Sequence, residues 1–153
     1  MESVWEFKRI CRSDLELADA LTCLPKPVGV VVFGPGKNNK FIYAFKICSI
    51  IENCTIEPHD QLVETMFEIG RSVVRIMDGE SSCSHKCRHE MFTNLKLAGA
   101  KTLIGVYVKC PDNMDGYGEK QREELDRQFQ RLRRNPPTAE GIDYLIVITP
   151  VET

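Results

Sequence analysis

The segment VGVVVFGPGKNN, residues 28–39, carries the strongest supersecondary-structure signal in this sequence. It opens on a continuous apolar run rich in valine, which is typical of a strand covered on both faces. Glycine, proline and asparagine then crowd together and give a strong turn signal. The apolar pattern resumes over 40–51, which contains FIYAFKI at 41–47. Two such runs around a short glycine-rich turn predict an antiparallel hairpin over 28–51.

The flanking sequence predicts further elements by its periodicity. Strands are expected at 4–10, 101–108 and 142–149, and helices at 13–24, 60–77, 89–100 and 119–134. The expected order is therefore β-α-β-β-α-α-β-α-β. We expect an α/β (or α+β) fold in which helices pack on a mixed sheet of about five strands, forming one domain over 1–153.

Composition limits the functions that this domain is expected to have. The chain has 153 residues and a formal net charge of −2, so it lacks a global attraction to phosphate backbones or anionic membranes. The start of the sequence mixes charged and apolar residues, unlike a signal peptide, and no apolar window is long enough to cross a membrane. We therefore expect a cytoplasmic or nuclear protein that does not engage membranes.

Cysteine is frequent, with seven residues in the chain. The number is odd, and the cysteines are scattered, mostly beside apolar residues. A small secreted disulfide scaffold would be shorter and poorer in apolar strands. The pattern predicts seven free thiols in a reducing compartment, most of them packed as small hydrophobic groups.

The most unusual local feature is a cluster of potential metal ligands at 83–89. Cys83, His85, Cys87 and His89 alternate over seven residues. Zinc usually takes four ligands from two short-spaced pairs that a longer loop separates. Because such a short segment can hardly surround one ion, the favoured interpretation is a solvated loop entering a helix. A zinc site completed by another residue or chain stays open as the alternative.

Two other segments carry possible phosphate or metal chemistry. In Gly34-Pro35-Gly36-Lys37 the second glycine comes too early for a phosphate loop and a strand is expected next, so a hairpin tip is favoured. Asp112 and Asp115 follow an expected strand, and Asp143 lies at the start of another. Together they could hold Mg²⁺, although a turn rich in Asp, Asn and Gly explains the first two equally simply.

The predicted helix at 119–134 has a weakly basic face. Lys120, Arg127, Arg131 and Arg134 lie on one side of it and could meet phosphates or an acidic partner. Acidic residues are interleaved among them, so a solvated outer face is the default interpretation.

These patterns favour a non-catalytic protein-interaction domain, acting as an adaptor or complex subunit without a cofactor. The expected contacts are edge strands, through Trp5 and Phe7 near the start of the chain and through Tyr144 and Ile146 near its end. Self-association, most simply as a homodimer, or a protein partner is expected. Two alternatives remain open. One is a metal-dependent enzyme acting on a nucleotide or nucleic acid through the three aspartates, and the other is an RNA-binding module using the basic helix.

Overall fold

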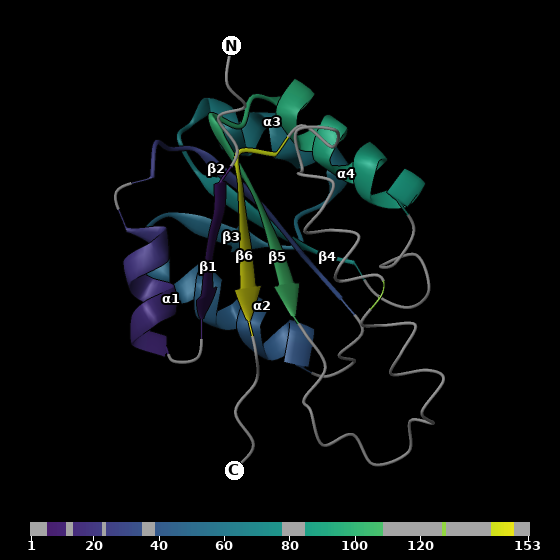
Figure 1. Ribbon diagram of the computed structural model, residues 1–153. Coiled ribbons are helices and arrows are strands. Elements are labelled where there is room, and N and C mark those ends of the chain that lie inside the picture. Colours follow the sequence, from purple (N-terminus) through teal and green to yellow (C-terminus); the bar gives the residue numbers. More distant parts are fainter. Residues whose placement is uncertain are drawn as a thin grey trace.

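The computed structural model describes the backbone of residues 6–11, 14–22, 24–34, 39–77, 85–108, 127 and 142–148, and the side chains of most of these. Helices cover both faces of a central sheet in these residues (Figure 1). The strands are β1 (Glu6–Cys11), β2 (Val28–Phe33), β3 (Cys54–Ile56), β4 (Ser72–Ile76), β5 (Thr102–Val108) and β6 (Tyr144–Ile148). The helices are α1 (Asp14–Leu21), α2 (Asn39–Ile50), α3 (Asp60–Glu68) and α4 (His85–Ala98).

The described sheet has six strands in the order β1-β6-β5-β2-β4-β3, and each of its pairings is parallel. The α/β class is therefore confirmed, whereas the expected mixed sheet is wrong for the described strands, and so is its antiparallel hairpin over 28–51. β2 is followed by helix α2, and it pairs with β4 and β5 on its two sides. A parallel sheet covered on both faces explains why β2 and β5 are buried at every position.

The sequence of helix α2 predicts a strand because both faces of the helix are apolar. Ala44, Ile47 and Ile51 recur at helical spacing and are buried against the sheet. Phe41, Ile42 and Phe45 lie on the outer side and are 43%, 50% and 59% exposed. Exposed apolar residues between buried ones produce the continuous run that is typical of an interior strand.

The helix expected over 60–77 is two elements. α3 ends at Glu68, and Gly70 turns the chain with a left-handed φ of 81° that other residues rarely adopt. The β-branched run that follows forms β4, in which Val73 and Val74 are both fully buried but belong to opposite faces of the sheet. The apolar residues of β4 happen to continue the helical spacing of α3, because this strand is buried on both faces. The two elements therefore resemble one long helix in the sequence.

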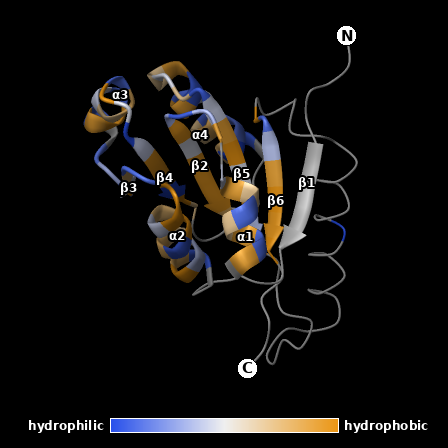
Figure 2. Ribbon diagram, turned by 90° about the vertical axis from the view of Figure 1, so that its left-hand side faces the viewer, coloured by the Kyte–Doolittle hydropathy of each residue, from blue (hydrophilic) through white to orange (hydrophobic). Residues whose placement is uncertain are grey.

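Two apolar cores, one on each face of the sheet, hold the three layers together. α1 and α2 pack on one face, where Leu17 and Ile47 meet Val30 and Val106. α3 and α4 pack on the other face. Figure 2 shows the central strands between these helices as hydrophobic along most of their length. Each strand of the sheet centre therefore contributes alternate residues to both cores.

The connections that leave β2 and β4 go to opposite faces of the sheet, because α2 lies on one face and α4 on the other. This makes the carboxyl ends of these neighbouring strands a topological switch point. Gly34, just after β2, has a φ of 126°, and a Cβ there would lie 2.4 Å from the Val108 carbonyl oxygen. Lys40 at the start of α2 is 2% exposed, and its Nζ donates to the Met77 carbonyl at 2.8 Å.

The remaining expected elements within the described residues are confirmed, with shifted bounds. β1, α1, β5 and β6 occupy the predicted positions, and α4 begins at His85 rather than at His89. The helix predicted at 119–134 lies outside the described residues except for Arg127, which is helical. None of the described helices is long and apolar enough to cross a bilayer.

Candidate functional site: a groove between two helices

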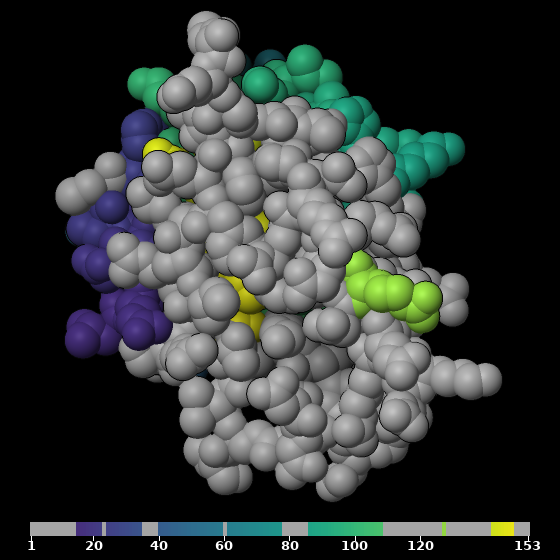
Figure 3. Space-filling view, viewed as in Figure 1, coloured from purple at the N-terminus to yellow at the C-terminus, as the bar shows by residue number. Residues whose placement is uncertain are grey.

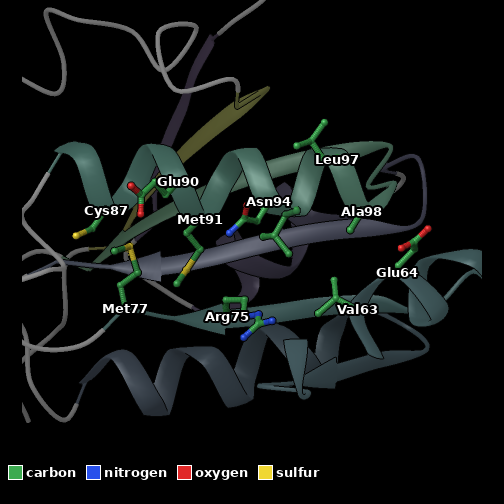
Figure 4. Close-up of a pocket in the computed structure, with 11 residues that line it drawn as sticks. Val63, Glu64, Arg75, Met77, Cys87, Glu90, Met91, Asn94, Leu97 and Ala98 are labelled. Carbon is green, nitrogen blue, oxygen red and sulfur yellow. The ribbon is translucent and has the colours of Figure 1, made fainter. Parts of the chain in front are cut away.

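A groove of about 660 Å³ lies between α3 and α4, with residues of β4 on its floor (Figure 4). This volume falls within the roughly 300–1,000 Å³ of typical ligand sites. Three elements that are separate in the sequence form it, and they meet because β4 lies beside β2 while α3 and α4 cover the same face. The groove is therefore a product of topology and not of one motif.

Helix α4 supplies the longest wall. Cys87, Met91, Asn94 and Ala98 line the groove, and steps of three or four residues place them on one side of a helix. Leu95 also contributes and is buried, since it belongs to the core beneath. The wall thus changes from sulfur-bearing side chains at the start of α4 to small and aliphatic ones at its end.

The floor and the opposite wall mix charge with apolar surface. Arg75 of β4 and Met77, which directly follows this strand, project on the α4 side. Arg75 is half-buried, and Met77 is 4% exposed. Val63 on α3 is buried. Figure 4 shows Glu64 and Glu90 toward opposite ends of the groove, and both are exposed. A cation on the floor therefore lies between carboxylates at the two ends.

The predicted metal cluster is only partly described. Cys83 lies outside the described residues, and His85 is placed by its backbone alone as the first residue of α4. Cys87 lines the groove, whereas His89 is exposed two positions later, about 200° around the helix. Within the described part of the chain, no three His, Cys, Asp or Glu side chains are placed to hold one metal ion.

Of the three candidate aspartates, the structure describes Asp143. Its Oδ2 accepts from the Leu103 amide at 2.9 Å, and its own amide donates to the Leu103 carbonyl at 2.8 Å. These bonds align the beginnings of β5 and β6, at the amino edge of the sheet. Asp112 and Asp115 lie outside the described residues but follow the opposite, carboxyl end of β5 in the sequence. The carboxylate of Asp143 is engaged in holding two strands in register.

The basic-helix residues Lys120, Arg131 and Arg134 also lie outside the described residues. Arg127 is exposed, and its atoms form the yellow-green patch on the surface in Figure 3. The phosphate or acidic-partner role of this helix stays a prediction.

Of the two strands expected at the edges of the sheet, one is an edge strand and the other is not. β1 is an edge of the described sheet, as predicted for the segment that contains Phe7, while Trp5 precedes the described residues. β6 is not an edge, because it pairs with β1 on one side and β5 on the other. Ile146 is 1% exposed within the core and Tyr144 is half-buried, so the partner-binding role expected of Ile146 does not fit its position.

The glycine-rich segment after β2 differs from its predicted context. The sequence predicts a hairpin tip here, but the next element described after β2 is helix α2 and not a strand. A helix in this position removes one of the two objections to a phosphate-binding motif, while the early second glycine remains. Residues 35–38 lie outside the described residues.

Two cysteines lie side by side where α2 approaches β3. The Cys48 thiol donates to the Cys54 carbonyl at 3.4 Å. Burial, followed by the neighbouring Cys48, raises the pKa of Cys54 well above its usual range. Cys48, Cys54 and Cys87 are outside disulfides. The other four side chains are not described, so the seven-thiol expectation stays a prediction.

The groove is not predictable from the expected elements, because these place Arg75 and Met77 on a helix that continues from Asp60. The signal that could have revealed it is local: Gly70 followed by the β-branched run of β4. Comparison with known protein families, curated protein sequences and solved structures finds no match for this chain.

Proposed function

We propose that this chain is a non-catalytic protein-interaction domain that holds a helical segment of a partner protein in the α3–α4 groove. The groove itself carries the proposal. Its α4 wall belongs to a helix of 14 residues, about 20 Å long, which matches several turns of a partner helix. Helix-in-groove recognition places an apolar stripe of the guest against such a surface. The proposed place of action is inside the cell.

The apolar lining suits an amphipathic guest. Leu97 is 81% exposed at the groove, and Met91 is half-buried. Methionine side chains are flexible and polarizable, so they adapt to guests of different shape. Burying Leu97 beneath a partner would contribute roughly 1.5–3 kcal/mol, which is the scale of one anchor residue in an interface.

The charges of the groove favour a particular guest. Exposed Glu64 and Glu90 lie toward its two ends, where they attract basic side chains on the flanks of a guest helix. The guest is therefore an apolar helical stripe flanked by lysine or arginine.

A selection experiment tests the proposal. Helical peptides from a phage-displayed library are selected on the purified full chain, labelled, and measured by fluorescence anisotropy. We expect Leu97→Asp to weaken binding of the selected peptides roughly 10-fold to 100-fold, because an apolar contact is lost and a carboxylate is desolvated. Glu90→Lys should weaken basic peptides as well.

Leu15→Asp is the matched control. Leu15 is also a leucine on a helix and is also 81% exposed, but it lies on α1, which packs on the other face of the sheet. Its substitution should leave the peptide affinity unchanged. The proposal is wrong if selection recovers no binding peptide, or if the recovered peptides bind Leu97→Asp as tightly as the unchanged protein.

A further inference from the structure

Three sulfur-bearing side chains gather at one end of the groove. Cys87 and Met91 lie one turn apart on α4, so both face the groove, and Met77 reaches it from the end of β4. Figure 4 shows the three side chains at the end nearer the start of α4, away from Val63 and Ala98. The three residues come from the two segments 72–77 and 85–98, which the sheet topology brings together.

We propose that Cys87, Met77 and Met91 form a binding site for a soft monovalent metal ion, Cu(I). Thiolate and thioether sulfurs are soft ligands that select Cu(I) over the hard and borderline divalent ions. Zinc sites instead use thiolate, imidazole and carboxylate ligands, usually four in number. The set at this end of the groove, one thiol and two thioethers, therefore fits copper rather than zinc.

The charge balance suits a partly buried position. When Cu(I) binds, the Cys87 thiol loses its proton to solvent, and one sulfur–copper bond replaces one sulfur–hydrogen bond. The thiolate carries one negative charge and the ion one positive charge, so the bound site is neutral. A neutral pair avoids the large desolvation penalty of an isolated buried charge. The two thioethers add ligands without adding charge.

Burial and flexibility also support the site. Met77 is 4% exposed, and Cys87 and Met91 are half-buried, so the sulfurs are shielded from bulk water yet border an open groove. An ion can therefore enter by ligand exchange from the groove side. Methionine has three rotatable bonds, which let its sulfur move onto an ion without a backbone shift. This inference is independent of the proposed peptide partner, because the ion needs only the sulfur-bearing end.

Competition against bicinchoninate under anaerobic conditions tests the site. The reduced full chain is titrated with the coloured Cu(I)–bicinchoninate complex, and loss of colour reports transfer of copper. The variants are Cys87→Ser, Met91→Leu and Met77→Leu, the last two chosen because leucine keeps a similar volume. Met66→Leu and Cys48→Ser are the controls, since both residues are half-buried but neither lines the groove.

We expect the tightest copper equivalent to weaken at least tenfold in Met91→Leu and in Met77→Leu, to vanish in Cys87→Ser, and to persist in both controls. Zn²⁺ should not displace it. Because Met91 is half-exposed, its variant should keep the far-UV circular dichroism of the parent even if the buried Met77→Leu does not. X-ray absorption at the copper edge should count three sulfur neighbours. Unchanged affinity in Met91→Leu, or no copper uptake by the parent, overturns the proposal.

Discussion

Replacing Ser72 with alanine removes one oxygen atom, yet we expect it to destabilise the fold substantially. Ser72 opens β4 and is fully buried. Its Oγ accepts from the Val28 amide at 2.9 Å, and Val28 is itself 1% exposed. The serine hydroxyl thus takes the place of a strand-to-strand bond at the point where β2 begins. Alanine would leave the Val28 amide buried without that acceptor.

The expected loss of folding free energy in Ser72→Ala follows from the energetic cost of leaving a buried hydrogen-bond donor unpaired. Such a group costs about 1–3 kcal/mol, more than the net contribution of an ordinary exposed hydrogen bond. For a chain of this size the change corresponds to a fall of roughly 2–12 °C in Tm. The backbone of Ser72, which donates to the Asn53 carbonyl at 2.7 Å, is retained in the variant. The effect is therefore assigned to the side chain.

Urea unfolding followed by far-UV circular dichroism measures the difference. Ser49→Ala is the matched control, because the Ser49 hydroxyl also bonds to the backbone, donating to the Phe45 carbonyl oxygen at 2.9 Å, but from the exposed side of α2. That variant should stay within about 0.5 kcal/mol of the parent. If Ser72→Ala is as stable as Ser49→Ala, the Val28 amide does not depend on this hydroxyl.

Four further outcomes are expected. Gly34→Ala should destabilise by about 2 kcal/mol or more in urea unfolding, because its φ of 126° and the 2.4 Å approach to the Val108 oxygen leave no room for a Cβ. The raised pKa of Cys54 keeps its thiol protonated in the fold, so stability should fall as pH rises above about 8.5, where the unfolded thiol ionises, and Cys54→Ser should flatten that fall. Alkylation in denaturant without reduction should add seven groups by mass, and a missing pair would indicate a native disulfide. Light scattering should detect a dimer, and Phe45→Asp should weaken it if the exposed side of α2 is the contact; a strictly monomeric parent would contradict self-association.

How much of the site could be predicted differs from residue to residue. Cys87 was singled out from the sequence, but for its neighbours in a seven-residue cluster and not for Met77 and Met91, with which it shares the groove. Asp143 was singled out as a possible metal ligand, whereas the structure engages its carboxylate with the Leu103 amide. The sequence shows which side chains are able to bind a metal ion. Which of them lie together depends on contacts between segments that are distant in the sequence.

The α/β class, the central strands β2, β5 and β6, and the helix α1 are predictable from local sequence patterns. A continuous β-branched run has few alternatives to a buried strand, and a capping signal followed by proline bounds a helix locally. The choice between helix and strand at α2 and β4 depends on tertiary packing, because their apolar residues fit both periods. Burial settled that choice. Phe41 and Phe45 face outward while Ala44 and Ile47 meet the sheet, and this division arises only when all three layers are packed together.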